Sequence, residues 1–229
     1  MTAYLIAAGL FLGAYLLGST PFGLLAGFLK GVDIREHGSK NIGATNAARV
    51  LGKPWFFVVL VLDAAKGAGC ALAGVWLTGP GSFDLGLIGG LGALLGHFFS
   101  VYLRFRGGKG VATGLGIVLV LAAPPDSWVP WPGLVAIALF IVTLAITRMI
   151  SASSMVAAVC LPLAYGQWLG GAIEQAFFVT RLVFFCVVAL AVIVKHRSNI
   201  RRILAGIEPR IGQKSAATPP GIQNEGAST

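Results

Sequence analysis

The sequence contains few charged residues, and this scarcity excludes most kinds of soluble enzyme. Only 11% of its 229 residues are charged, whereas 56% are hydrophobic and the mean hydropathy is +0.85. A membrane-spanning helix needs about 20 consecutive apolar residues, and apolar runs fill most of this chain. The sequence therefore predicts a single transmembrane domain over residues 1–214, followed by a disordered cytoplasmic tail over 215–229.

Metal-binding and nucleotide-binding patterns are also lacking. The three cysteines lie apart within apolar runs, and none belongs to a Cys-x-x-Cys or Cys/His spacing. The Gly-x-x-x-x-Gly-Lys-Ser/Thr loop of nucleotide hydrolases is absent. These absences predict a protein without a metal site, a disulfide or a cofactor.

Seven apolar stretches, bounded by charges, proline and glycine, predict an all-α polytopic membrane protein with seven transmembrane helices. They cover residues 4–28, 55–78, 85–103, 110–123, 133–147, 149–169 and 177–194. The fourth stretch is short for a full span and begins in glycines, so we expect it to be tilted or buried among other helices.

The 17 basic and 8 acidic residues are divided between alternate connections. Lys and Arg gather in loops 29–54 and 104–109, at Arg148 and in the tail, whereas the other connections carry the acids Asp84, Asp126 and Glu174. Basic loops stay on the cytoplasmic side of a membrane. The pattern places the N-terminus outside and the C-terminus in the cytoplasm, and it assigns the positive charge to a membrane face and anionic substrates rather than to nucleic acid.

Two clusters on the predicted cytoplasmic face combine positive charge with glycine and small polar residues. The first, within residues 35–49, offers Ser39, Lys40, Asn41, Thr45, Asn46 and Arg49. The second opens the fourth predicted helix with Arg104, Gly107, Gly108, Lys109, Gly110 and Thr113. Glycines let backbone N–H groups approach an anion, and a helix N-terminus adds a positive dipole. Both clusters are therefore candidate phosphate sites.

A third cluster, at residues 195–210, follows the last predicted span. His196 and Asn199 are three residues apart, so they share a face of a helical continuation and are expected to point toward the other clusters. Three such clusters on one side of a small bundle indicate a phosphorylated, partly lipidic substrate whose acyl chain enters from the bilayer. A transporter or channel for phosphorylated solutes is the alternative, and a purely structural membrane subunit is a more distant one.

Four ionisable side chains within the predicted spans have structural interpretations. Asp63 and Lys66 lie at positions i and i+3, where pairing lowers the cost of burying both charges. His97 is expected to be a packing residue or a wall of the site. Arg181 is expected to snorkel outward from its span.

Several motifs in the clusters and spans resemble the bacterial acyl-phosphate:glycerol-3-phosphate acyltransferase family of integral membrane enzymes. The resemblance covers about residues 4–212 and rests on Gly18-Ser-x-Pro-x-Gly23, Gly38-Ser-Lys-Asn-Ile-Gly-Ala-Thr-Asn46 through Arg49, Asp63-x-x-Lys-Gly67, Gly96-His97, Phe105-Arg-Gly-Gly-Lys-Gly-Val-Ala-Thr113, and His196-Arg-x-Asn-Ile200 through Gly206-x-Glu208. It implies transfer of an acyl group from a fatty acyl phosphate to the 1-hydroxyl of glycerol 3-phosphate, an early step of phospholipid synthesis at the cytoplasmic face of the bacterial inner membrane. The products are lysophosphatidic acid and inorganic phosphate.

The same resemblance implies roles for individual residues. Ser39 and Arg49 would belong to the first essential motif, and Gly107, Gly108, Lys109 and Gly110 would bind glycerol 3-phosphate. His196 and Asn199 would contribute from the third motif, and Glu208 would be structural.

The acyl phosphate donor is what the resemblance implies, and the histidines disfavour a different acyltransferase mechanism. No acid lies five residues after His37, His97 or His196, so the His-x-x-x-x-Asp signature of acyl-CoA-dependent acyltransferases is absent. An acyl phosphate already carries a good leaving group, so positioning and cationic stabilisation can supply much of the rate. We therefore expect direct transfer without an acyl-enzyme. His196 and a phosphate oxygen of the donor are both candidates for the base.

Overall fold

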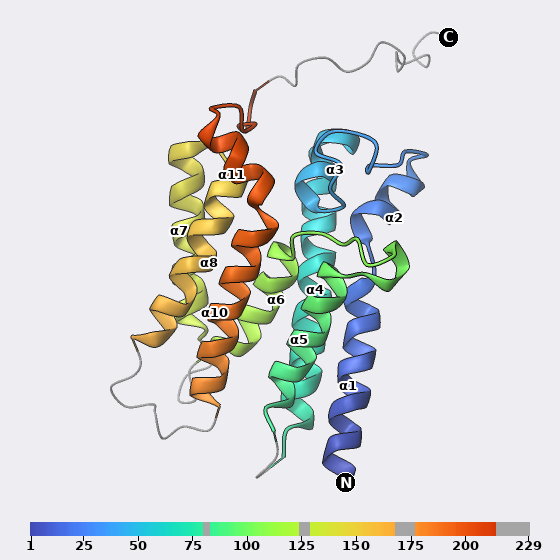
Figure 1. Cartoon of the computed structure of the whole chain (residues 1–229), viewed down its shortest axis with the longest axis vertical. Helices are drawn as coiled ribbons and strands as arrows, with labels where there is room; N and C mark the ends of the chain where they lie inside the picture. The colour runs from blue at the N-terminus through green and yellow to red at the C-terminus, as the bar shows by residue number, and fades with distance from the viewer. Residues whose placement is uncertain (80–82, 124–128, 168–176, 214–229) are drawn as a thin grey trace.

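The computed structural model describes residues 1–79, 83–123, 129–167 and 177–213, and the regular structure in these ranges is helical. Figure 1 shows the elements α1 (Thr2–Ser19), α2 (Phe22–Leu29), α3 (Ala44–Leu51), α4 (Pro54–Leu77), α5 (Leu85–Phe98), η1 (Val101–Leu103), α6 (Val111–Leu121), α7 (Trp131–Thr147), α8 (Ile150–Gly166), α10 (Phe178–Lys195) and α11 (Arg197–Leu204). The predicted disordered tail, Lys214, Asp126 and Glu174 lie outside the described residues.

Every stretch predicted to span the membrane contains an apolar helix. Four helical segments are long and apolar enough to cross a bilayer: Thr2–Leu29, Pro54–Leu77, Leu85–Leu103 and Phe178–Lys195. The helices α6, α7 and α8 are apolar but shorter. The 11 residues of α6 reach only about 17 Å at 1.5 Å per residue, against about 30 Å for the bilayer core. The prediction that this segment is short is confirmed.

The first predicted span is not one continuous helix. Pro21 has no N–H to donate, and a residue before proline is disfavoured in the helical conformation. Accordingly α1 ends at Ser19, Thr20 is extended, and α2 begins at Phe22. The Nζ atom of Lys66 donates to the carbonyl of Thr20 at 2.8 Å, so the break has a polar partner in α4.

The helices α1, α4, α5 and α6, which we call the first helix group, pack backbone against backbone. α5 packs on α1 and α4, and α4 packs on α6. A Cβ atom at Gly96 would collide with the carbonyl oxygen of Tyr15, and one at Gly89 would collide with that of Cys70. Such close approach by small residues is typical of membrane helices, which associate without a hydrophobic driving force.

The helices α7, α8 and α10 form a second helix group that packs through larger side chains. α8 packs on both α7 and α10. The ring of Tyr165 stacks on Phe178 at 5.0 Å and meets Phe185 edge-on at 5.0 Å. α6 is the helix of the first group that lies next to the second (Figure 1), and residues of both groups, including Ile117 and Phe185, share one buried cluster.

The three basic clusters come to the same half of the molecule. The N-terminus lies at one end of the bundle, whereas α2, α3 and α11 lie at the other, and the loop 104–110 is in the half with α3 and α11 (Figure 1). Residues more than 150 positions apart in the sequence are therefore brought together at one end.

Candidate active site

The first cluster is organised around the buried side chain of Asn46. Its Oδ1 atom accepts a hydrogen bond from the backbone N–H of Ser39 at 2.8 Å, and its Nδ2 atom donates to the carbonyls of Ile34 and His37 at 2.7 and 3.2 Å. Asn46 is only 1% exposed. Its amide therefore shapes the loop that presents Ser39, and the predicted contact of Asn46 with substrate stays a prediction.

The other predicted residues of this cluster are more accessible. Ser39, Lys40 and Arg49 are exposed. Asn41 and Thr45 are half-buried, and the Oδ1 atom of Asn41 accepts from the backbone N–H of Gly43 just before α3. The hydroxyl, ammonium and guanidinium groups of the exposed residues are thus the parts of this cluster that an anion can reach.

Two glycines of the second cluster are held against the end of α5. The N–H groups of Gly107 and Gly108 donate to the carbonyls of Phe98 and His97 at 3.2 and 3.0 Å, so both groups have partners within the protein, and the predicted contact of these glycines with substrate stays a prediction. A Cβ atom at Gly108 would collide with Nε2 of His97. The sequence could not show this, because the requirement for glycine comes from the end of α5 rather than from a ligand.

The backbone groups of the second cluster that can bind an anion are the N–H groups of residues 109–113. Gly110 has a φ of +73° and precedes the first residue of α6. Among the described residues, no hydrogen bond uses the N–H groups of residues 109–113. These groups and the positive end of the helix dipole favour a negative ligand. Thr113 points away from solvent: it is fully buried, with its Oγ1 atom 3.3 Å from Nδ1 of His97.

Lys109 joins the second cluster to the third. Its Nζ atom donates to Oδ1 of Asn199 at 2.5 Å, and Nδ2 of Asn199 donates to Oε1 of Glu208 at 2.7 Å. Oε1 of Glu208 also accepts from Oγ of Ser151 at 2.6 Å, and Oε2 accepts from Nε of Arg202 at 2.6 Å. We call these five residues the Lys109 network. The expected convergence of these two clusters is confirmed, and Glu208 occupies the expected structural position.

Sequence reasoning missed Ser151 and Arg202. Ser151 is buried in α8, within a stretch interpreted only as a span. A serine at the basic end of an apolar segment was the available signal, but its partner Glu208 is 57 residues away.

Positive charge is in excess around the network. Burial lowers the pKa of Lys109 to about 8, with Arg202 and Arg49 adding to the effect and Glu208 opposing it. The charge of Arg49 therefore acts on Lys109, which brings the first cluster close to the other two. Burial alone would raise the pKa of Glu208, but hydrogen bonds from Ser151, Asn199 and Arg202 hold it below its ordinary value. One carboxylate thus faces three cations.

His196 is buried at the junction of α10 and α11. Its Nδ1 atom lies 2.8 Å from the carbonyl of Val192, which can only accept, so Nδ1 carries the proton. Burial, together with the charge of Lys109, lowers the pKa of His196 to about 4. At neutral pH the imidazole is uncharged, and Nε2 is the nitrogen that can accept a hydrogen bond.

The buried pair predicted within α4 is present. Nζ of Lys66 lies 2.6 Å from Oδ1 of Asp63, and Nδ1 of His97 is 3.8 Å from the same oxygen. His97 is buried and supports the glycine loop from behind through its backbone carbonyl. The predicted pairing of Asp63 with Lys66 is therefore confirmed, and the structural role of these three residues stays a prediction.

The expectation for Arg181 is wrong. Its Nε atom lies 2.6 Å from Oδ2 of Asp84, and its Nη1 atom donates to the carbonyl of Leu121 at 3.2 Å. The guanidinium does not snorkel to water because a carboxylate is available at the start of α5, 97 positions away in the sequence. Asp84 also accepts from the N–H of Leu87 and so caps α5.

A basic cavity of about 690 Å³ adjoins the glycine loop. Its walls come from two segments, residues 35–42 and 102–107, and the lining residues are Arg35, Lys40, Asn41, Ile42, Tyr102, Leu103, Arg104, Arg106 and Gly107. In the described part of the chain, no group of three or more His, Cys, Asp or Glu residues could hold a metal ion. The chemistry that this half of the molecule offers is the binding of anions by cations, amides and free N–H groups.

Comparisons with known proteins agree with that chemistry. A family profile for glycerol-3-phosphate acyltransferase matches residues 8–206. The glycerol-3-phosphate acyltransferase of Acaryochloris marina is 41% identical over 235 aligned residues, which cover 95% of this chain and 98% of the relative. That of Parasynechococcus marenigrum is 46% identical over 204 residues, covering 88% of each chain.

Two solved structures are also similar to this chain. Both are crystal structures of PlsY (YgiH), an integral membrane glycerol 3-phosphate acyltransferase, and both are 37% identical in sequence to this chain. The glycerol 3-phosphate form has a TM-score of 0.78 and the alignment covers 90% of this chain and 96% of that one. The lysophosphatidic acid form has a TM-score of 0.76 with coverage of 90% and 95%.

Proposed function

The chain belongs to the integral membrane glycerol-3-phosphate acyltransferase family and makes lysophosphatidic acid from glycerol 3-phosphate, and we propose that it takes the acyl group from a fatty acyl phosphate beside the Lys109 network. The observation that carries this proposal is the contact between Lys109 and Asn199. It places a cationic side chain, a helix N-terminus and the third cluster at one point. Two anionic substrates need such a point, because their phosphates repel each other.

The reaction then needs little covalent chemistry from the protein. The 1-hydroxyl oxygen of glycerol 3-phosphate attacks the carbonyl carbon of the acyl phosphate, the bond from that carbon to the phosphate oxygen breaks, and the hydroxyl proton leaves with inorganic phosphate. Lys109 and the N–H groups at the start of α6 bind the phosphate of glycerol 3-phosphate. Arg49 binds a phosphoryl oxygen, and Ser39 donates a hydrogen bond near the reacting carbonyl.

The base in this scheme is a phosphate oxygen of the donor rather than His196. A general base is most effective when its pKa is close to the working pH, and the pKa of His196 is about 4. His196 instead accepts a hydrogen bond at Nε2 and so orients the hydroxyl. Asn199, held by Glu208, keeps Lys109 in place.

The protein is an integral membrane protein with several helices that pass through the bilayer. We infer that seven helices span it and that the site faces the cytoplasm of a bacterial inner membrane. Support comes from the alternation of basic and acidic connections along the sequence. Glycerol 3-phosphate then reaches the site from the cytoplasm, and the acyl donor reaches it from the bilayer.

The donor is tested by reconstituting the purified chain in vesicles with labelled glycerol 3-phosphate and one of three donors: acyl phosphate, acyl-CoA or acyl-carrier protein. Lysophosphatidic acid should form with acyl phosphate alone. Turnover only with acyl-CoA would overturn the donor assignment. Uptake of labelled glycerol 3-phosphate into the same vesicles without a donor would instead support the transporter alternative.

Direct transfer is tested by omitting the acceptor. The wild type is incubated with labelled acyl phosphate, denatured and weighed by mass spectrometry, with Ser39→Ala as the matched control. No acyl adduct should be found on either protein. An adduct on Ser39 that glycerol 3-phosphate discharges would show that Ser39 is a nucleophile.

A further inference from the structure

The basic cavity holds more positive charge than its own carboxylates neutralise. Arg35 pairs with Asp33 at 2.6 Å. The other three cations that line the cavity, Lys40, Arg104 and Arg106, have no carboxylate partner among the described residues. Unpaired cations around a cavity attract a ligand with negative charge.

Two exposed aromatic residues belong to the same turn as the cavity arginines. Tyr102, which is 57% exposed, lines the cavity, and Phe105, which is 62% exposed, stands in the sequence between the cavity residues Arg104 and Arg106. The turn that presents them is fixed, because the N–H of Phe105 donates to the carbonyl of Ser100 at 2.8 Å and Oγ of Ser100 donates to the carbonyl of Ser19 at 2.6 Å. Aromatic rings beside arginines are typical of protein surfaces at the membrane–water interface.

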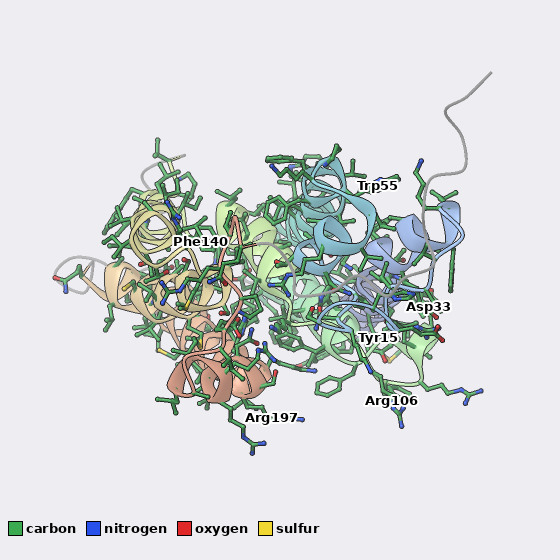
Figure 2. All side chains as sticks on the ribbon, turned by 90° about the horizontal axis from the view of Figure 1, so that it is seen from above. Tyr15, Asp33, Trp55, Arg106, Phe140 and Arg197 are labelled. Atoms are coloured by element: carbon green, nitrogen blue, oxygen red, sulfur yellow. The ribbon has the colours of Figure 1, made fainter. Side chains whose placement is uncertain are left out.

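The position of this turn also fits the membrane–water interface. It lies at the C-terminal end of the segment Leu85–Leu103, which is long and apolar enough to cross a bilayer. Seen from above the bundle, Arg106 lies at the outer rim, on the side of Asp33 and Tyr15 (Figure 2). With Leu85–Leu103 crossing the bilayer as proposed above, a ligand at this rim would border the lipid.

We propose that the basic cavity binds the phosphate head group of an anionic phospholipid of the bilayer, with the acyl chains lying against Tyr102 and Phe105. The charges select the phosphate, and the exposed rings select a ligand with acyl chains over a free anion. Because Gly107 lines the cavity and leads to Lys109, a bound lipid holds the glycine loop in place from its outer side. The proposed lipid site rests on the location of the enzyme in the membrane, and it holds whichever acyl donor the enzyme uses.

Arg106 is the residue to change, because it lines the cavity and has no role in the proposed reaction. Arg197 is its matched control: it is also an exposed arginine, at the start of α11 and away from the cavity (Figure 2). The wild type, Arg106→Glu and Arg197→Glu are inserted in nanodiscs of equal parts phosphatidylglycerol and phosphatidylcholine. Native mass spectrometry then measures which lipid each protein retains.

The wild type and Arg197→Glu should retain phosphatidylglycerol in preference to phosphatidylcholine. In Arg106→Glu this preference should fall by at least about fivefold, because losing one cation near an anionic lipid alone has an effect of that size and the new carboxylate adds repulsion. Equal retention of both lipids by the wild type, or an equal loss in the two variants, would overturn the proposal. Millimolar inorganic phosphate should not displace the retained lipid, and its displacement would assign the cavity to a free anion.

An activity measurement separates this proposal from the proposed function. In vesicles of phosphatidylcholine alone, Arg106→Gln should make lysophosphatidic acid as fast as the wild type. On addition of phosphatidylglycerol, the wild type should gain activity and Arg106→Gln should gain less. A loss of activity by Arg106→Gln already in phosphatidylcholine would mean that Arg106 acts on the substrates, and it would overturn the lipid assignment without affecting the proposed reaction.

Discussion

The two helix groups are linked by charged side chains at both ends of the bundle, and the two links differ in kind. Near the N-terminal end, Arg181 of α10 meets Asp84 before α5, so one cation faces one carboxylate. At the opposite end, Lys109 before α6 meets Asn199 of α11, and three cations surround the single carboxylate of Glu208. The first link is neutral as it stands, whereas the second carries excess positive charge. In the proposed function, similar residue types therefore serve structure at one end and substrate binding at the other.

The largest effect is expected from breaking the neutral link. Asp84→Ala leaves the guanidinium of Arg181 without its carboxylate, and removing one partner of a buried pair costs about 3–5 kcal/mol. Thermal unfolding in detergent should shift accordingly, with an unchanged KM for glycerol 3-phosphate. The double variant Asp84→Leu/Arg181→Leu should recover part of the loss. A raised KM in the folded single variant would mean that this end also contributes to binding.

Breaking the cationic link should instead reduce the use of glycerol 3-phosphate and leave stability nearly unchanged. Lys109→Ala removes one charge-assisted contact to phosphate, worth on the order of 1.5–3 kcal/mol, which is about 10- to 150-fold in kcat/KM for glycerol 3-phosphate. The free energy of unfolding should change little, because burying the charge of Lys109 in the folded protein is itself unfavourable. Steady-state kinetics with a fixed acyl phosphate concentration measures the effect, and an unchanged KM with intact turnover would contradict the site.

Substitutions of Arg49 test what the first cluster contributes at the cationic end of the bundle. Arg49→Ala should lower kcat by about tenfold or more if one hydrogen-bonded charge contact is lost. Arg49→Lys should restore only part of that loss, because an ammonium cannot reproduce a two-pronged guanidinium contact. Full recovery with lysine would show that Arg49 supplies only charge. Lys53→Ala, a change of a basic residue just beyond α3, is the control.

The smallest expected effect is a pH dependence. A lysine whose pKa is lowered to about 8 is charged below pH 8 and loses its charge above it. The kcat/KM for glycerol 3-phosphate should therefore fall by up to about tenfold between pH 7 and pH 9. Lys109→Arg should flatten this limb of the profile, since arginine stays charged. An identical alkaline limb in that variant would assign the titration to another group.

Much of the fold could be predicted from the sequence, because membrane spans and basic loops are local patterns. The short helix at α6 and the pairing of Asp63 with Lys66 follow from residues close together in the chain. The break at Pro21 was also readable, since proline carries its constraint with it. The structure leaves the number of crossings and their direction as predictions.

What the sequence could not show depends on distant partners. Arg181 was misinterpreted because its carboxylate lies 97 positions earlier, and the packing of Gly108 against the ring of His97 could not be seen in the sequence. Asn46 and Thr113 were predicted to bind substrate from their place in polar motifs; both are buried and hydrogen-bonded within the protein, and their contact with substrate stays a prediction. Residue type indicates that a site is present, but partners from distant segments decide how each member of a motif is held.

The central claim is that the link with excess positive charge binds glycerol 3-phosphate and the neutral link does not. Isothermal titration of glycerol 3-phosphate into the detergent-solubilised protein, without a donor, compares the wild type with Lys109→Ala and with Arg181→Leu/Asp84→Leu. Each variant alters the link at one end of the bundle. The account predicts binding weakened about tenfold or more in Lys109→Ala and unchanged in the double variant. Equal affinity in Lys109→Ala and the wild type would contradict it.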